Sequence, residues 1–352
     1  MSSTAERKSV FLMRVSSLAV CFSLPSPFTL ILTGFLPTPK LLRTFRASTA
    51  THTAAHPTLA TRPFIFKQLV SQSPRMMQCC IQNKLLCNVF LRSTGSFGDG
   101  AGITEQYVEW LREYCEAFYN GLTVKLLPAV TVAASSCTFR VNSNTNNLQL
   151  HAGDLLAFLK QRKPKDAFCI VGITMIDLYP KDSWNFVFGQ ASLTEGMGVF
   201  SFARYDDDFY KRSYAGRLKK AIKLKPGDYS VFQGYYTPPI SSILLLRSCK
   251  TLTHEIGHIF GIKHCQWLQC VMQGSNHLEE SDRRPLDLCP ICLRKLQCAI
   301  RFKIADRYKA LLQWIDNGTG NSDQQSGKPT LAFQDFRQWL IKCLSILADE
   351  SI

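Results

Sequence analysis

Three histidines and a glutamate lie close together in the stretch HEIGHIFGIKHC, which begins at His254. On a helix, His254 and His258 project from the same face one turn apart, so one zinc ion can bind both imidazoles at about 2.0–2.1 Å. Glu255 can reach a water molecule on that zinc. Gly261 permits the chain to turn after the helix, so His264 can supply a third ligand. Three protein ligands leave the fourth zinc position open for water, as catalysis requires.

The short form of this motif also occurs by chance on amphipathic helices, where its histidines are only polar surface residues. The longer form, with a glycine and a third histidine at fixed offsets, arises by chance far less often. Three of the chain's seven histidines fall within this segment. We therefore interpret the segment as a zinc site.

Four cysteines follow in a pattern of their own. Cys265 and Cys270 form one pair, and Cys289 and Cys292 form a second pair, Cys-Pro-Ile-Cys, after a gap of eighteen residues. Two short pairs at this separation suit a tetrahedral zinc held by four thiolates at about 2.3 Å, which is a closed and therefore structural site. The alternatives are two disulfides or four unrelated thiols.

Met272 lies between the two cysteine pairs, in Cys-Val-Met-Gln-Gly. A methionine at a tight turn soon after such a helix can form the hydrophobic floor beneath zinc-binding histidines. A single methionine is more often an ordinary core residue. Its position favours the first interpretation.

Together, HEIGHIFGIKHC, QWLQC, the Val-Met pair and CPIC resemble the archaemetzincins, a branch of the metzincin zinc peptidases. The upstream segments CIVGITMIDLYP and NFVFGQASLTEGMGVFSFARY fit the same family, and the resemblance covers residues 88–348. It implies an α+β fold: a compact metzincin-like domain with a mixed β-sheet, an active-site helix and a Met-turn, plus a structural four-cysteine zinc loop. The implied roles are Glu255 as general base, Met272 as the Met-turn, His254, His258 and His264 as catalytic zinc ligands, and Cys265, Cys270, Cys289 and Cys292 as structural zinc ligands.

The function that follows from these residues is a zinc metallopeptidase with two zinc ions per chain and a peptide or protein substrate. It would hydrolyse peptide bonds through a zinc-bound water, with Glu255 as general base. One alternative is a zinc-binding interaction module with little or no peptidase activity, although Glu255 has no obvious role in a purely structural site. A second alternative is a nucleic-acid-binding zinc protein.

The distribution of charge argues against the nucleic-acid alternative. The 352 residues carry a formal charge of +15, but residues 1–98 hold eleven Lys or Arg and one acid, whereas the remainder holds 30 basic and 25 acidic residues. The excess charge therefore lies mainly outside the zinc-binding region, and we expect no nucleic-acid partner. Thiolate zinc sites beside many scattered cysteines predict a reducing, intracellular compartment, either cytoplasm or nucleus.

Residues 1–87 form a separate basic segment that we predict to be disordered or an alternative start, before a peptidase domain at residues 88–348. A targeting segment and a membrane anchor are the other interpretations. The apolar stretch at residues 15–36 is interrupted by Pro25 and Pro27, which disfavours a spanning helix of about 20 residues. We therefore expect no membrane partner.

Hydrophobic periodicity predicts the elements that must position these residues. The active helix is expected at residues 241–261, and further helices at 103–119, 152–160, 304–316 and 331–347. Strands are expected at residues 88–92, 122–132 (broken by Pro128), 168–176, 185–188 and 198–205. Residues 197–202 are our candidate for an exposed edge strand that pairs with an extended substrate, and an internal strand is the alternative.

Overall fold

The computed structural model describes residues 88–94, 101–192, 194–212, 239–317 and 327–349, with a few more between 214 and 235. The predicted basic segment at residues 1–87 lies outside the described residues. In the part that is described, no helix is both long enough and apolar enough to cross a membrane.

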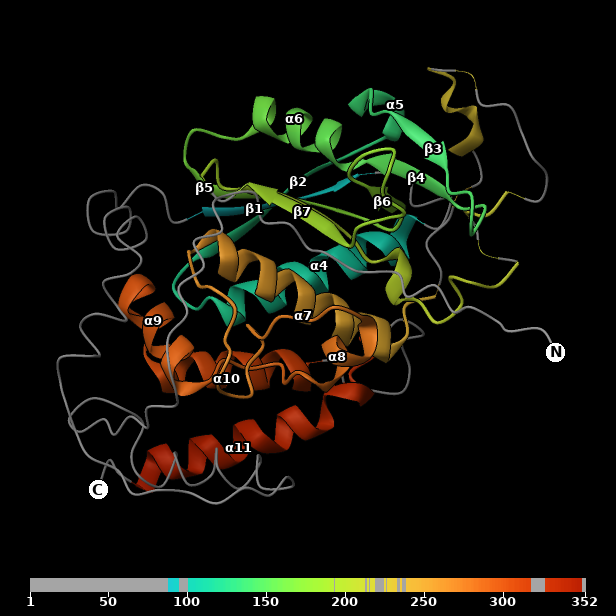
Figure 1. Ribbon diagram of the computed structural model, residues 1–352. Coiled ribbons are helices and arrows are strands. Elements are labelled where there is room, and N and C mark those ends of the chain that lie inside the picture. The colour runs from blue at the N-terminus through green and yellow to red at the C-terminus, as the bar shows by residue number, and fades with distance from the viewer. Residues whose placement is uncertain are drawn as a thin grey trace, which may run out of the picture.

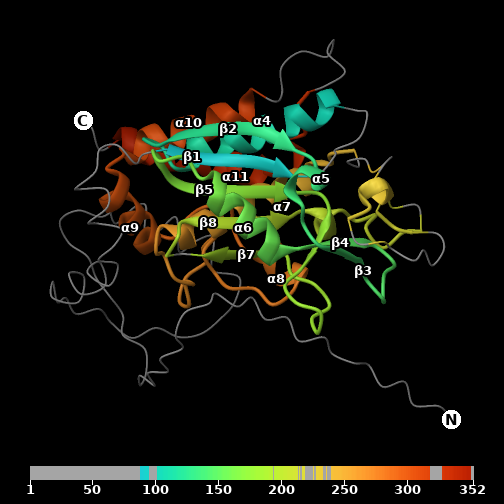
Figure 2. The same cartoon turned by 90° about the horizontal axis from the view of Figure 1, so that it is seen from above.

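A five-stranded sheet forms the centre of the fold (Figures 1 and 2). Its strands, in spatial order, are β2 (Thr123–Val130), β1 (Asn88–Thr94), β5 (Ala167–Thr174), β8 (Met197–Ser201) and β7 (Gly189–Ser192). The first four run parallel to one another, and β7 pairs with β8 in the antiparallel direction. The predicted α+β fold with a mixed sheet is therefore confirmed.

Helices cover both faces of this sheet. Helix α6 (Ala152–Arg162) lies on one face, and α4 (Ala101–Phe118) and α7 (Ser242–Ile259) lie on the other (Figure 1). Behind them pack α10 (Ile304–Asp316) and α11 (Gln334–Asp349). A second sheet and three further α-helices are also described: β3 (Phe139–Val141), β4 (Leu148–His151), β6 (Asp177–Tyr179), α5 (Val132–Ser135), α8 (Leu278–Arg283) and α9 (Pro290–Ile300).

The apolar core has two main clusters, one on each face of the sheet, and the central strand β5 contributes to both. Its side chains alternate between the two faces of the sheet, as in any strand. Cys169, Val171 and Ile173 enter the apolar cluster shared with α4, α7 and α10, whereas Ile170 enters the cluster beneath α6. Both faces of β5 are thus buried, which explains its nearly continuous apolar sequence.

The aromatic stripe of α4 packs inward, as expected of core residues. Tyr107 and Tyr114 are buried, and the Tyr107 hydroxyl donates to Ser248 Oγ on α7 at 2.6 Å. This bond ties α4 to the helix that carries the histidines.

The candidate substrate edge at residues 197–202 is wrong. Strand β8 lies inside the sheet, between β5 and β7, and β7 is the last strand of the sheet among the described residues. The local sequence indicated a strand but not its neighbours, because strand pairing is set by contacts between distant segments. The strand β2 continues through Pro128, but its pairing with β1 shifts register there, between the pairs Arg92–Leu127 and Thr94–Val130. The predicted break is therefore an irregularity of the pairing and not an end of the strand. Because β2 is an edge strand, a residue without an amide hydrogen is tolerated there.

Candidate active site and metal centres

Helix α7 carries the first two histidines and begins at a side-chain cap. Ser241 Oγ accepts a hydrogen bond from the Leu244 amide at 3.1 Å, which satisfies one of the unpaired amides of the first turn. The helix is buried along its whole second half, from Ser248 to Ile259. His254 and His258 therefore lie inside the protein, with ring centroids 4.5 Å apart and Nε2 atoms 3.0 Å apart.

A reversal of the chain after α7 brings in the third histidine. Gly261 has a φ of 86°, the left-handed conformation that glycine adopts readily, as the sequence predicted. The Ile262 amide then bonds back to the Gly257 carbonyl at 3.0 Å. As a result, one ring nitrogen of His264 comes within 4.8 Å of a ring nitrogen of both helix histidines.

The hydrogen bonds of the two helix histidines determine which ring nitrogen is available to bind a metal ion. Nδ1 of His254 lies 2.7 Å from the Val271 carbonyl, and Nδ1 of His258 lies 2.7 Å from the Ile262 carbonyl. A carbonyl only accepts, so each Nδ1 carries the proton, and each neutral ring presents the lone pair of Nε2.

Burial keeps these rings neutral. It lowers the pKa of His254 well below its usual value and that of His258 to about 4, and neighbouring imidazoles and Arg284 add to the effect. Two lone pairs that face each other at 3.0 Å repel unless a cation lies between them. Zinc bound at about 2.1 Å to each nitrogen would hold them about 3.4 Å apart, so the donor set fits the ion.

Glu255 lies beside this donor set and is 4% exposed. Its Oε1 has no hydrogen-bond partner among the described residues. Burial raises the pKa of its carboxyl to about 8, and the Arg284 guanidinium opposes this shift. A carboxylate with an unused oxygen and a raised pKa is suited to accepting a proton near neutral pH.

The four cysteines form a second cluster, with all four Sγ atoms within 4.8 Å of one another. Cys265 Sγ and Cys289 Sγ are 3.7 Å apart, far beyond the roughly 2.05 Å of a disulfide, so the two-disulfide alternative is wrong. Four thiolates around zinc at about 2.3 Å would lie about 3.8 Å apart, which matches. The Met272 and Cys289 amides also point at Cys270 Sγ, at 3.4 and 3.3 Å.

Met272 links the two clusters within the segment 271–273, which we call the Met-turn. The side chain is 1% exposed, and a Cβ added to Gly257 on α7 would lie 2.6 Å from its sulfur. The Met-turn is held on both sides, because the Met272 carbonyl accepts from Cys265 N at 2.8 Å and Val271 N donates to the Asp287 carbonyl at 2.8 Å. The methionine therefore packs against the helix between His254 and His258.

We expect Met272→Ala to lower the free energy of unfolding by about 2–5 kcal/mol, because it leaves a cavity beneath α7. Met272→Leu conserves the volume and should cost less than about 1.5 kcal/mol. Denaturant unfolding of both variants beside the unsubstituted chain measures the difference. Equal stability of the two variants would contradict the packing described.

A buried ion pair anchors the loop between the cysteine pairs to α10. Arg307 is 0% exposed, and its Nη2 lies 2.7 Å from Asp287 Oδ1. Its Nε also donates to the Phe118 carbonyl at 2.8 Å. The loop that contains the Met-turn is thereby joined to both α4 and α10.

We expect Asp287→Asn to destabilise the protein by about 3–5 kcal/mol, because the Arg307 charge would remain buried without its partner. Asp316→Asn is the matched control: Asp316 also lies 2.7 Å from an arginine, Arg337, but that pair is partly exposed and should contribute at most about 1 kcal/mol. Thermal unfolding compares the two. A similar loss in both variants would show that burial is not decisive.

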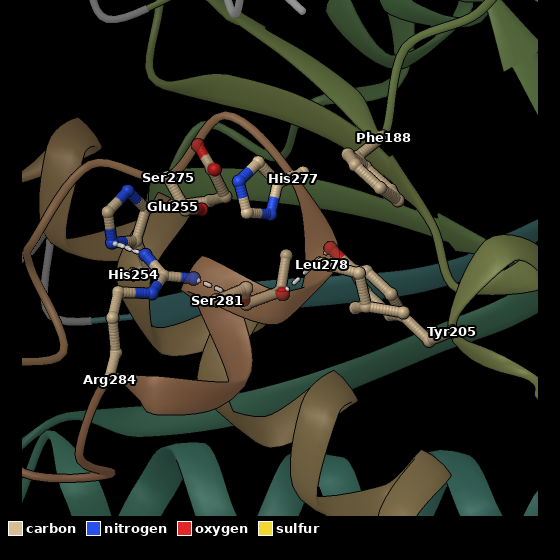
Figure 3. A pocket seen from close by; sticks show the side chains of 10 residues that line it. Phe188, Tyr205, His254, Glu255, Ser275, His277, Leu278, Ser281 and Arg284 are labelled. Atoms are coloured by element: carbon tan, nitrogen blue, oxygen red, sulfur yellow. Dashed lines mark hydrogen bonds between the residues drawn. The ribbon is translucent and has the colours of Figure 1, made fainter.

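A pocket opens beside the histidines (Figure 3). The aromatic rings of Phe188 and Tyr205 stand on one side, and His254, Glu255 and Arg284 on the other. The two aromatic rings are stacked, with centroids 5.1 Å apart. The remaining lining residues are Thr251, Ser275, His277, Leu278 and Ser281.

Sequence reasoning located the three histidines, Glu255, Met272 and the four cysteines, and the structure brings each set together. It did not identify Phe188, Tyr205, His277 or Arg284 as pocket residues. Phe188 and Tyr205 are distant from the motif along the chain, and Arg284 lies in a loop segment whose spacing indicates no role. It also missed α8 and α9, which lie in the segment we expected to be a loop.

The chain is similar in sequence to known peptidases. A model of peptidase family M54 matches residues 190–298. Archaemetzincin-2 of Macaca fascicularis is 62% identical over 271 residues, and the match covers 74% of this chain and 75% of the relative. Archaemetzincin-2 of Homo sapiens is 60% identical over the same length, with the same coverage. The crystal structure of an archaemetzincin from Methanopyrus kandleri is 25% identical, with a TM-score of 0.42, and the match covers 62% of this chain and 98% of that one.

Proposed function

This chain belongs to the archaemetzincin family, and on that basis we propose that it is a zinc-dependent peptidase in which Glu255 is the general base. The observation that carries the proposal has two parts: the Nε2 atoms of His254 and His258 lie 3.0 Å apart, and His254 lines the same pocket as the buried side chain of Glu255. A purely structural zinc site would have no use for that carboxylate or for the pocket.

Three residues would hold the catalytic zinc: His254, His258 and His264. The Val271 and Ile262 carbonyls support the binding, because they fix the tautomer and the orientation of the two helix histidines. When bound, zinc would polarise the scissile carbonyl and lower the pKa of a water molecule from about 15.7 towards about 7.

Glu255 would move the proton. Its free oxygen accepts the proton of the attacking water, and the carboxylic acid then donates this proton to the nitrogen of the leaving amine. The low exposure of Glu255 supports this role, because a desolvated carboxylate binds a proton more tightly than one in water.

The substrate would lie along β7, the last strand in the described part of the sheet. An extended peptide can add to such an edge through backbone hydrogen bonds. β7 begins at Gly189, directly after the pocket residue Phe188, and it contacts α7. A peptide paired with β7 would therefore pass the pocket beside His254 and Glu255.

We propose a second zinc, a structural one, held by Cys265, Cys270, Cys289 and Cys292. We also propose that residues 88–348 form the peptidase domain and that the protein is intracellular. Six further described cysteines are free thiols, which suits a reducing compartment.

Peptide cleavage analysed by mass spectrometry tests the proposal. The full chain is incubated with a mixed peptide pool, with and without a zinc chelator, and zinc is then added back. We expect new peptide termini only in the zinc-loaded sample, with restoration on adding zinc. Cleavage that persists after the histidine-bound metal is removed would rule out the zinc mechanism, and a zinc-loaded chain that cuts no peptide would favour a binding role.

A further inference from the structure

Arg284 is a buried arginine without a carboxylate partner. It is 7% exposed, and no Asp or Glu oxygen lies within ion-pair distance of it among the described residues. Arg204 and Arg307, which are buried to a similar degree, pair with Asp177 and Asp287 at 2.7 Å. The guanidinium of Arg284 is therefore held by acceptors of a different kind.

Those acceptors belong to the machinery around the histidines. Nη1 donates to the Gln273 carbonyl at 2.7 Å and to the Val271 carbonyl at 3.4 Å, on either side of Met272. Nη2 donates to Ser281 Oγ on α8 at 2.7 Å. Nη1 also lies 3.0 Å from His254 Nδ1, whose own proton goes to the closer Val271 carbonyl.

One rigid, planar group thus joins two elements, the Met-turn and the pocket wall formed by α8. It lies beside the ring of His254 (Figure 3). The Val271 carbonyl is shared, since it orients His254 and also accepts from Arg284. Lysine could not reproduce this contact, because its single ammonium lacks the fixed fork of donors.

We propose that Arg284 is a positioning residue for the histidine metal site. It acts by fixing the Met-turn through the Val271 and Gln273 carbonyls, the first of which orients His254. The proposal rests on the proposed function, in that it takes the three histidines as metal ligands. Partners that orient a metal-binding histidine typically contribute 10–100-fold to metal affinity or activity. Loss of Arg284 should therefore weaken metal binding at the histidines without disturbing the four-cysteine site.

The test compares Arg284→Met and Arg284→Lys with Arg283→Met, a control that makes the same change at the exposed neighbouring residue. Zinc release is followed by metal analysis during titration with a chelator, and the histidine-bound ion is identified by its loss in His258→Ala. The kcat and KM for a cleaved peptide are measured separately, and thermal unfolding reports the fold.

We expect both Arg284 variants to release the histidine-bound zinc at about 10–100-fold lower chelator concentration and to lose kcat by a similar factor. KM and the four-cysteine zinc should be unchanged, and Arg283→Met should match the unsubstituted chain. A third variant, Arg284→Ala, leaves space for a small molecule, and added guanidinium should restore part of its kcat because it can occupy the same acceptors.

Two results would overturn the proposal. A rise in KM with normal zinc affinity and kcat would make Arg284 a substrate contact, and a lower unfolding temperature alone would make it only a stabilising residue. Both differ from failure of the proposed function itself, in which the unsubstituted chain would bind no metal at the histidines. Arg284→Lys keeps the charge and most of the volume, so it provides a folded variant if Arg284→Met does not fold.

Discussion

Glu255→Gln is expected to reduce peptide hydrolysis by about 10²–10⁴-fold, the usual contribution of a general base. The amide has the shape of the carboxylate but cannot accept a proton at pH 7. Because Glu255 is 4% exposed and Oε1 has no described partner, the change breaks no hydrogen bond at that oxygen. The fold and the bound metal should therefore survive while turnover is lost.

The measurement is the rate of product formation from one peptide, at equal zinc content per chain. Glu279→Gln is the matched control, because it makes the same chemical change on the exposed face of α8. Full activity in Glu255→Gln would exclude Glu255 as the base. An equal loss of activity in Glu255→Gln and Glu279→Gln would show that the loss does not depend on the position of the substituted glutamate.

Cys292→Ser should release one of two zinc ions and destabilise the loop between the cysteine pairs by several kcal/mol. Structural zinc contributes about 10–16 kcal/mol of binding energy to small zinc domains at pH 7, and this energy is coupled to folding. Cys292 Sγ is one of four within 4.8 Å of one another, and few other interactions hold a cluster of thiolates together without an ion. Because the same loop carries Met272 and Arg284, activity should also fall.

Zinc per chain is measured by elemental analysis, and stability by thermal unfolding. Cys298→Ser is the control, since Cys298 is a half-buried free thiol on the same helix, α9. Retention of two zinc ions in Cys292→Ser would show that the four cysteines do not hold the second ion. A similar zinc loss in Cys298→Ser would point to a general effect of removing a thiol.

Expectations based on short-range pattern agreed closely with the structure for the long helices. The strand expected at residues 185–188 is wrong, since the strand in that region is β7, at Gly189–Ser192. The periodicity at residues 304–316 coincides with α10, and the helix expected at 241–261 is α7 with its cap at Ser241. The turn at Gly261 and the one-turn spacing of His254 and His258 are also local features. A helix places neighbours by its own 3.6-residue repeat, so the sequence alone predicts which side chains share a face.

The order of the strands and the position of the pocket depend on contacts between segments that are distant in the sequence. Residues 197–202 were correctly expected to form a strand, but only the pairing of β8 with both β5 and β7 makes it internal. Likewise, Pro128 is compatible with β2 because β2 lies at an edge. These outcomes depend on which distant segments pack together, which local pattern does not encode.

By itself, the sequence determined the candidate ligand set, because residue type and spacing decide which side chains can present nitrogen or sulfur to one ion. Only the tertiary structure shows which groups hydrogen-bond to those ligands and orient them. The Val271 carbonyl reaches His254 across seventeen residues, and Arg284 reaches that carbonyl from a loop thirteen residues further on. Such contacts form only when the Met-turn, α7 and α8 are packed, since backbone acceptors are alike in sequence and differ only in where the fold places them.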